Sequence, residues 1–445
     1  IVLEPGETFI SPEACVGLVS GGLDEAVNAM HEHVRSSVIP GENKCLIGFG
    51  MGAEHDMNAD TTLQYLEQAA RSGAEVFIID AGWYCPPGME NHWHPLAGNW
   101  DADPGRYPDG IGAIEKRCRE LGMKFGFWME VERIGPESRI FAGHRDWYAI
   151  RRNGSHIDGF LDFSEPEVVE WAIGEASRVI EKYHLDLFRV DYNVSARDMF
   201  HANDGECRSI RHVEGVYRLY SELKKRFPEV IFENCAGGGG RTDLGIMRFF
   251  DHTWVSDRQI APRSLEITNG MTMALPPDRV DRLVAGMGGH EIGSLAFQMR
   301  NAMFGHISIN VFAPKDAAMN DEVFEFIKHS TDLYKNFIRP FIASAKIFHH
   351  TPDTNEIKRN GIVILELASE DQSRGVLGVF TLPGFGGQVI NVRPRGLDIS
   401  KNYHVTFDNS RRSVVIDGFR LVNDGLNIRQ NGAFQSELVT FEAID

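Results

Sequence analysis

Short apolar stretches alternate with longer helix-like stretches between about residue 44 and residue 312. The apolar stretches predict strands at 44–49, 75–80, 124–130, 186–191, 230–235, 252–257 and 304–310. The longer stretches predict helices at 61–73, 111–122, 167–184 and 212–227. Repeated strand-then-helix order predicts a parallel sheet. Seven or eight such units fit an α/β fold of the (β/α)8 barrel type better than an open doubly wound sheet.

The pattern changes after about residue 345. Short strand-like stretches now follow one another, separated by turn residues, at 361–369, 374–383, 388–394, 403–409, 412–418 and 437–444. Such a series predicts an antiparallel β-sandwich of about 100 residues. We therefore expect an N-terminal segment at 1–40 with one helix, a barrel at 41–344 and a C-terminal β-sandwich at 345–445.

The chain is long and acidic. Its 445 residues exceed one ordinary domain, and 42% hydrophobic with 24% charged residues is typical of a soluble globular protein. A formal net charge of −18 argues against nucleic acid or an anionic membrane surface as a partner. It favours a neutral ligand. No apolar run approaches the roughly 20 residues that span a bilayer.

The cysteines and the first residues bear on the compartment. The six cysteines include no CxxC pair, so we expect reduced thiols and a cytoplasmic protein. The N-terminus shows neither the basic region nor the apolar core of a signal peptide. Because the chain begins without a methionine, it is expected to be trimmed or a fragment.

Carboxylates stand where the predicted barrel strands end. Catalytic groups of such barrels lie at the carboxyl ends of the strands. One such acid alone could cap a helix or pair with a base such as Arg189, but five strands end this way. The acids are Asp80, Glu130, Asp191, Glu233 and Asp257, and Trp83, Trp128, Tyr192 and Trp254 accompany them. Acids together with aromatic side chains predict a carbohydrate site, because sugar hydroxyls bind carboxylates and sugar rings stack on aromatic faces.

Two other kinds of site fit these residues less well. A divalent metal would also suit carboxylates, but no HExxH, EF-hand or histidine-cluster spacing supports one, so no metal is expected. The stretch "AGGGGR" at 236–241 lacks the Lys-Ser/Thr of a phosphate-binding P-loop. These glycines are expected instead to let the backbone pass close to a ligand.

Five segments carry a resemblance to a known family. They are "IIDAGWY" (78–84), "KFGFWMEVE" (124–132), "DLFRVDYN" (186–193), "FENCAGGGGRTD" (232–243) and "HTWVSDRQ" (252–259). In this order they resemble glycoside hydrolase family 36, the melibiase family of α-galactosidases, which includes α-N-acetylgalactosaminidases and raffinose synthases. The chain's start, "LEPGETFISPE", resembles the end of the family's N-terminal β-sandwich, so the rest of that sandwich is expected to be missing.

The resemblance implies a retaining mechanism with two aspartates. Asp191 occupies the nucleophile position and Asp257 the acid/base position, with the two carboxyls roughly 5–5.5 Å apart. A cation at Arg189 is expected to favour the ionised form of Asp191. The residues expected to bind substrate are Asp80, Trp83, Trp128, Glu130, Arg189, Asn193, Cys235, Gly237, Gly238, Trp254 and Arg263.

The chain departs from the family pattern at four positions. Ala81 replaces the second of two adjacent acids, and Arg189 replaces a lysine. His156 is the nearest counterpart of an expected arginine, and Ile260 stands where a second aspartate is usual. Because sites that bind a hydroxyl by hydrogen bonds discriminate strongly, these changes are expected to alter the preferred sugar more than the mechanism.

Three hypotheses follow. The first is an exo-α-glycosidase, an α-galactosidase acting on an oligosaccharide or glycoside without a cofactor. The second is the same mechanism on a different sugar or acceptor, as in an α-N-acetylgalactosaminidase or transglycosylase. The third is a non-catalytic sugar-binding protein. A homo-oligomer is compatible with all three.

Overall fold

The computed structural model describes residues 3–39, 41–51, 57–89, 92–150, 155–193, 208–258, 261–285, 294–310 and 321–444. The chain forms two compact units. The first unit comprises residues 1–18, 50–67 and 76–250, and the second comprises 19–49, 68–75 and 251–445.

Eight parallel strands make a closed barrel, in the order β1-β10-β9-β8-β7-β6-β3-β2. The strands are β1 (Gly48–Met51), β2 (Val76–Ile79), β3 (Lys124–Met129), β6 (Leu187–Val190), β7 (Ile231–Asn234), β8 (His252–Trp254), β9 (Val280–Ala285) and β10 (His306–Asn310). This confirms the predicted (β/α)8 barrel.

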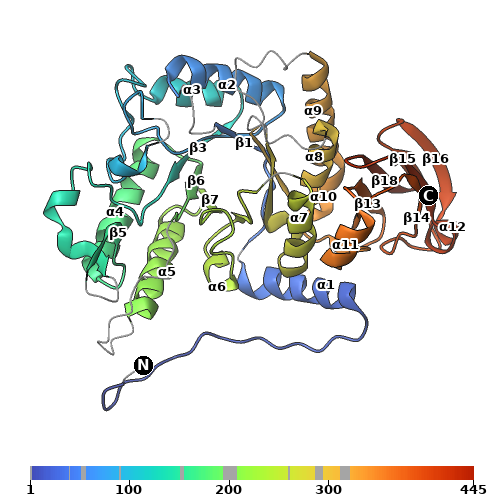
Figure 1. The fold of residues 1–445 in the computed structure, drawn as a ribbon, viewed down its shortest axis with the longest axis horizontal. Coiled ribbons are helices and arrows are strands. Elements are labelled where there is room, and N and C mark those ends of the chain that lie inside the picture. The colour runs from blue at the N-terminus through green and yellow to red at the C-terminus, as the bar shows by residue number, and fades with distance from the viewer. Residues whose placement is uncertain are drawn as a thin grey trace. The chain divides into compact units, whose positions relative to one another are not determined.

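Helices cover the outside of these strands. They are α2 (Ala59–Arg71), α3 (Gly112–Glu120), α4 (Pro166–Lys182), α5 (Arg208–Arg226), α6 (Leu244–Met247), α7 (Arg263–Ala274), α8 (Leu295–Ala302) and α9 (Asp321–Leu333). In the first unit, α4 and α5 run side by side next to β6 and β7 (Figure 1). The buried positions of α4 recur every three to four residues, from Val168 and Ala172 to Val179, so that one apolar stripe faces the sheet.

Strand β6 shows why an apolar sequence becomes a barrel strand. Leu187, Phe188 and Val190 are all at most 2% exposed, as expected for parallel strands that are covered on both faces. Arg189 lies inside the same strand and is also buried. A charged group there needs a partner, and its partners belong to the site described below.

Some elements differ from those expected. Strand β9 is not among the predicted strands, because Asp281 and Arg282 interrupt its apolar pattern. A short antiparallel hairpin, β4 (Tyr148–Ile150) and β5 (His156–Leu161), lies between β3 and α4 and was also not predicted. Strand β8 ends at Trp254, three residues before the predicted end at Asp257.

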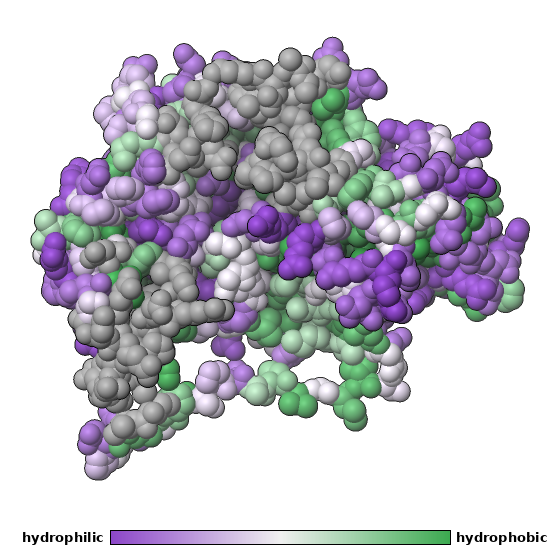
Figure 2. Space-filling view, viewed as in Figure 1, coloured by the Kyte–Doolittle hydropathy of each residue, from purple (hydrophilic) through white to green (hydrophobic). Residues whose placement is uncertain are grey.

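The C-terminal part is built from antiparallel strands in two sheets, a six-stranded sheet in the order β11-β12-β13-β18-β15-β16 and the pair β14-β17. Their bounds are β11 (Lys346–His349), β12 (Ile362–Ala368), β13 (Arg374–Thr381), β14 (Gln388–Val392), β15 (Asn402–Phe407), β16 (Arg412–Asp417), β17 (Leu426–Gln430) and β18 (Ser436–Ile444). One apolar core joins both sheets and includes Val379, Ile390 and Ile428. Hydrophilic residues (purple) predominate on the face of these strands seen in Figure 2.

The remaining helices are α1 (Leu23–His33), continued by a π-helical turn at Val34–Val38, α10 (Arg339–Ile342), α11 (Thr354–Asn360) and α12 (Gly418–Asn423). Among the described residues, no helix is both long and apolar enough to cross a bilayer. Of the described cysteines, Cys15, Cys45, Cys85 and Cys118 are free thiols. The boundaries of the three parts expected from the sequence stay predictions.

Candidate active site

Four of the predicted acids belong to neighbouring strands of the first unit. Asp80 follows β2, Glu130 follows β3 and Asp191 follows β6, while Glu233 lies within β7. Parallel strands present their carboxyl ends at one edge, so these side chains are brought to the same end of the sheet. Hydrogen bonds join them in two sets, Asp80 with Glu233 through Arg189 and Asp191 with Glu130 through Asn193. Burial raises the pKa of both Asp80 and Glu130, and the charge of Asp191 raises both further, so the two sets form one acidic cluster.

Arg189 connects two of these acids. Its Nη1 donates to Asp80 Oδ2 at 2.9 Å, and its Nε donates to Glu233. The guanidinium is 3% exposed and Glu233 is 1% exposed, so the Glu233 end of this bridge between β2 and β7 is buried, whereas Asp80 keeps 28% of its side chain exposed. The ion pairs described for Arg189 go to Asp80 and Glu233, and its expected influence on Asp191 stays a prediction.

Asp191 is held by neutral donors. Its Oδ2 accepts hydrogen bonds from the indole Nε1 of Trp128 at 3.1 Å and from the amide of Asn193 at 2.7 Å. Its Oδ1 accepts from the backbone N–H groups of Tyr192 at 2.7 Å and Gly237 at 2.9 Å. The carboxylate is 8% exposed. Four donors therefore fix the plane of a carboxylate that keeps a small opening to solvent.

The glycine-rich stretch supplies one of those donors. Gly237 has a φ of +53° and Gly238 a φ of +78°, a region of backbone conformation that favours glycine. The turn is closed by the backbone N–H of Ala236, which donates to the carbonyl of Gly238 at 2.8 Å. The N–H of Gly238 contacts Cys235 Sγ at 3.3 Å. These glycines thus bring the backbone close to Asp191, in addition to any contact with a ligand.

The predicted tryptophans occupy two different positions. Trp128 contacts Asp191 directly, whereas Trp83 is fully buried and stacks on Phe127 with ring centroids 4.4 Å apart. The indole nitrogen of Trp83 donates to the backbone carbonyl of Trp128 at 2.9 Å. Trp83 therefore supports Trp128 from behind and offers no face to a sugar.

Asn193 links Asp191 to Glu130. Its backbone N–H donates to Glu130 Oε1 at 2.7 Å, and its side-chain amide lies 3.3 Å from Glu130 Oε2. Arg133 Nε also donates to Glu130, at 3.0 Å. Burial raises the pKa of Glu130, and the nearby charge of Asp191 adds to that effect, although Arg133 opposes it.

Sequence reasoning did not identify Arg133 or Arg241. Arg241 forms a two-pronged ion pair with Glu132, at 2.7 and 3.2 Å, and its guanidinium lies 4.1 Å from the centre of the Tyr192 ring. Burial alone would raise the pKa of Glu132, but Arg241 lowers it below its ordinary value. Arg241 is the last residue of the quoted "AGGGGR" stretch, so its place in the motif was visible although its partner was not.

Three predicted residues belong to the second unit. Asp257 is exposed and lies three residues after β8, which ends at the half-buried Trp254. Arg263 begins α7, is 66% exposed and pairs with Glu266 at 3.3 Å. The positions of Asp257, Trp254 and Arg263 in the site stay predictions.

Three of the four departures from the family pattern lie in the described part of the chain. Ala81 is buried, and its backbone N–H donates to Asp80 Oδ1 at 2.7 Å. Arg189 forms the bridge described above. His156 is exposed at the start of β5. Ile260 lies outside the described residues.

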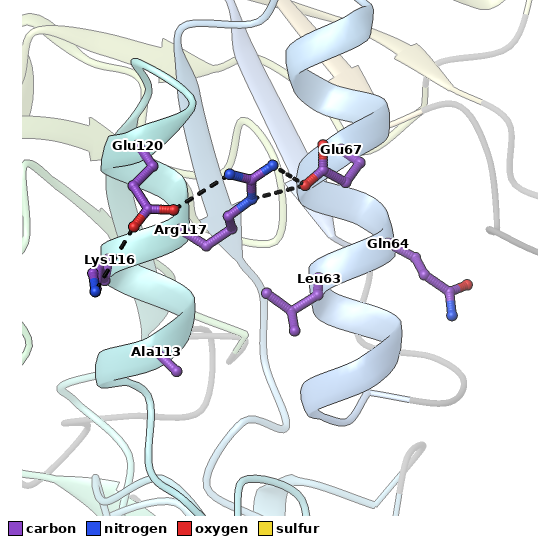
Figure 3. Close-up of a pocket in the computed structure, with 7 residues that line it drawn as sticks. All are labelled: Leu63, Gln64, Glu67, Ala113, Lys116, Arg117 and Glu120. Atoms are coloured by element: carbon purple, nitrogen blue, oxygen red, sulfur yellow. Dashed lines mark hydrogen bonds and ion pairs between the residues drawn. The ribbon is translucent and has the colours of Figure 1, made fainter.

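A surface pocket lies between α2 and α3 (Figure 3). Its lining includes Leu63 and Ala113, and Arg117 crosses it to reach Glu67 at 2.6 Å. This ion pair is exposed and contributes little to stability. The pocket contains none of the predicted site residues, so it is separate from the acidic cluster.

Comparison with known families covers most of the chain. Residues 8–344 match the family described as Melibiase. Residues 362–441 match the glycosyl hydrolase family 36 C-terminal domain.

Relatives of similar sequence carry the name α-galactosidase. A probable alpha-galactosidase G of Emericella nidulans is 28% identical, and the match covers 99% of this chain and 61% of the relative. Alpha-galactosidase AgaA of Geobacillus stearothermophilus is 26% identical over 91% of this chain and 56% of its own length. An alpha-galactosidase of Escherichia coli is 28% identical over 88% and 56%. The chain thus spans less than two thirds of these relatives.

Solved structures share the fold. The alpha-galactosidase of Lactobacillus brevis superposes with a TM-score of 0.84 at 24% identity, over 96% of this chain and 59% of the other. The Geobacillus stearothermophilus enzyme AgaA, solved in complex with stachyose, gives a TM-score of 0.85 at 22% identity, over 96% and 60%. With the family match over more than half of its length, the chain belongs to the melibiase family of glycoside hydrolase family 36.

Proposed function

We propose that the chain is the catalytic portion of a retaining exo-α-glycosidase that releases terminal α-galactosyl residues. The observation that carries this proposal is the carboxylate of Asp191. It stands at the end of β6, nearly buried, and its plane is fixed by Trp128, Asn193 and two backbone N–H groups. A nucleophilic carboxylate needs this fixed orientation, because attack at a sugar carbon requires close alignment of the reacting atoms.

The proposed reaction has two steps. In the first, an Asp191 oxygen bonds to the anomeric carbon while the bond to the leaving oxygen breaks, and Asp257 gives that oxygen its proton. In the second, Asp257 takes a proton from water, the water oxygen bonds to the anomeric carbon, and the bond to Asp191 breaks. Two inversions leave the product with the α configuration of the substrate.

The groups around Asp191 would either bind the sugar or position the residues that do. Asp80 keeps 28% of its side chain exposed although Arg189 binds it, so it can still accept a hydrogen bond from a sugar hydroxyl. Glu130 is fully buried and paired with Arg133, so it positions Asn193 rather than contacting a ligand. Trp128 lies beside the nucleophile but is only 2% exposed, so it positions Asp191 through its indole N–H rather than offering a wide face to the sugar.

The preferred sugar is part of the proposal. The Geobacillus stearothermophilus AgaA structures contain raffinose and stachyose, which supports a galactoside substrate here. One observation favours a second candidate. Ala81 is buried at the position of a second acid and contributes only a backbone N–H to Asp80. With one hydroxyl-binding carboxylate fewer, an α-glycosidase for another sugar, or a transglycosylase, is the alternative.

Hydrolysis of aryl α-glycosides tests both candidates. The panel comprises the galactoside, N-acetylgalactosaminide, glucoside and arabinopyranoside, each with wild type and with Asp191→Asn. Release from the galactoside, abolished in Asp191→Asn, is expected. Release from another sugar would support the second candidate. Undiminished turnover by Asp191→Asn would overturn the proposed nucleophile, and products analysed with excess acceptor sugar separate transfer from hydrolysis.

Asp257→Ala tests the acid/base assignment separately. Loss of a general acid and base lowers turnover about 10²–10⁴-fold. Added azide should restore release from an activated aryl glycoside, because azide attacks the glycosyl-enzyme without needing a base. The product should be the α-glycosyl azide. A variant with normal turnover, or one unaffected by azide, would argue against Asp257.

The cytoplasm is the compartment we propose. It is supported by the free thiols of Cys45, Cys85 and Cys118, which are buried in the fold. Labelling of the protein in intact cells with a membrane-impermeant thiol reagent checks this, since the exposed thiol of Cys15 would react only if it faced the outside.

A further inference from the structure

Three buried side chains of the second unit converge at the starts of neighbouring strands. They are His252 at the first position of β8, Asp281 at the second position of β9 and His306 at the first position of β10. Their side chains are 1%, 2% and 4% exposed. Asp257 follows β8 at its other end, so this triad lies at the opposite end of that strand from the predicted acid/base.

The strand register places the three side chains on one face of the sheet. His306 pairs with Asp281 across β10 and β9, and Trp254 pairs with Asp281 across β8 and β9. His252 lies two residues before Trp254 and therefore points the same way. Arg282, on the opposite face, donates to the carbonyl of Ser264 in α7. Since α7 covers the outside, the triad points into the barrel.

The hydrogen bonds of His306 define which nitrogen carries a proton. Its Nε2 lies 2.7 Å from the backbone carbonyl of Leu46, which can only accept, so Nε2 carries the hydrogen. A neutral imidazole then has a lone pair on Nδ1. That Nδ1 faces Asp281 Oδ1 at 3.0 Å. Two lone pairs in such close contact require a cation between them, either a proton or a metal ion.

His252 contacts the other carboxylate oxygen of Asp281. Its Nδ1 lies 3.1 Å from Asp281 Oδ2, and the two imidazole rings have centroids 4.0 Å apart. One ligand atom from each residue can be chosen so that all lie within 4.8 Å of one another. Zinc bound at 2.0–2.2 Å holds neighbouring ligand atoms roughly 3.3 Å apart. The two His–Asp contacts, at 3.0 and 3.1 Å, are close to this value, and the remaining separation is at most 4.8 Å.

The surroundings of His306 also match those of a metal ligand. Metal-bound histidines commonly donate their other ring N–H to a backbone carbonyl, which fixes the tautomer and orientation of the ring. Leu46 has this position relative to His306. Two imidazoles and one carboxylate are a ligand set that suits zinc and related divalent transition metals rather than calcium or magnesium.

We propose that His252, Asp281 and His306 bind a structural divalent transition metal of the zinc type. The ion would join the starts of β8, β9 and β10 and, through Leu46, fix the segment that leads into β1. This departs from the expectation of no metal. The residues are separated by 29 and 25 positions, so no sequence motif marks them.

The test is the metal content of the full chain. The chain is purified without a histidine tag, incubated with zinc chloride, freed of excess ion by gel filtration and assayed by plasma mass spectrometry. Wild type is expected to retain about one zinc per chain. Asp281→Asn and His306→Gln should retain about tenfold less. The control is His329→Gln, because His329 also pairs with an aspartate, Asp408 at 2.8 Å, whose other partner is Arg300 rather than a second histidine.

Three outcomes overturn the proposal. The first is a folded wild type without retained zinc, which would show that the triad is bridged by protons. The second is retained zinc in a folded Asp281→Asn or His306→Gln. The third outcome needs only wild type, so it also decides the case in which the variants fail to fold. It is an X-ray absorption spectrum of the bound zinc that shows sulfur ligands or lacks scattering from imidazole rings. Circular dichroism establishes folding in each case.

Discussion

At the scale of single residues, the hydrogen bonds of Asp191 suit it to the nucleophile's role that its place in the sequence predicts. Its carboxylate is held by an indole, an amide and two backbone N–H groups, all of them neutral. A full countercharge would hold a carboxylate more tightly and would lower its reactivity toward carbon. Neutral donors fix its orientation and leave its negative charge available for attack.

The indole of Trp128 gives a prediction at this scale. Trp128→Phe removes the donor to Asp191 Oδ2 but keeps an aromatic ring, and it should lower kcat about 10–100-fold, which corresponds to one hydrogen bond to a charged group. The measurement is steady-state hydrolysis of the substrate that the aryl glycoside panel selects.

Trp100→Phe is the matched control. Trp100 is also buried in the same aromatic cluster, 6.4 Å from Trp128 by ring centroids, and its indole nitrogen has no hydrogen-bond partner among the described residues. The Trp100→Phe variant should lose about as much stability as Trp128→Phe but keep the wild-type kcat. Equal losses of kcat in both variants would mean that packing, not the hydrogen bond, supports Asp191.

At the scale of elements, strand β6 and the residue after it direct two side chains, Arg189 and Asp191, into the barrel. Arg189 and Asp191 are two residues apart, so both point into the barrel, while Phe188 and Val190 point toward the helices. Arg189 then bridges β2 and β7 through Asp80 and Glu233. The strand therefore carries its catalytic candidate beside a residue that ties its neighbours together.

This bridge predicts a large stability effect. Arg189→Met should lower the free energy of unfolding by about 3–5 kcal/mol, because it leaves the buried carboxylate of Glu233 without its cation. Urea unfolding followed by circular dichroism measures it.

An exposed arginine provides the comparison. Arg218 pairs with Glu170, and their side chains are 50% and 57% exposed. Arg218→Met should therefore cost only about 0–1 kcal/mol. A similar small cost for Arg189→Met would show that the bridge does not stabilise the barrel.

At the scale of the whole molecule, two buried groups of the second unit link stability to pH. Burial lowers the pKa of His31 from 6.5 to about 3. Burial alone would raise the pKa of Asp24, but hydrogen bonds from His349 and Arg395 lower it to about 2. In both cases the unfolded chain binds more protons than the folded chain as the pH falls, so acid destabilises the fold.

The pH dependence is a prediction for global stability. Between pH 6.5 and about 3, protonation of His31 in the unfolded chain should remove roughly 1.4 kcal/mol of stability per pH unit. Below about pH 4, protonation of Asp24 in the unfolded chain should add to this loss of stability. Thermal unfolding in a series of buffers from pH 7 to pH 4 measures the slope.

His31→Leu isolates the main contributor. The variant should lose most of the slope between pH 6.5 and 4, since leucine does not titrate. His404→Leu, at an exposed position of β15, should keep the wild-type slope. An unchanged slope in His31→Leu would assign the acid sensitivity to other groups.

The sequence by itself determined the barrel and the places of its acids. Local patterns were enough because buried parallel strands are apolar on both faces, as at Phe77 and Phe188, and because the residue after each strand lies at a common edge. The antiparallel C-terminal part was predicted for the same kind of reason, from short strands separated by turn residues.

Only the tertiary structure decided which charged groups pair. Arg189 lies two residues from Asp191, but its described ion pairs go to Asp80, 109 positions away, and to Glu233, 44 positions away. Strand β9 was missed because Asp281 and Arg282 look unsuited to a buried strand until His306 and Ser264 are placed beside them. Burying a charge is favourable only with a partner at hydrogen-bond distance, and strands far apart in the sequence supply those partners when the chain folds.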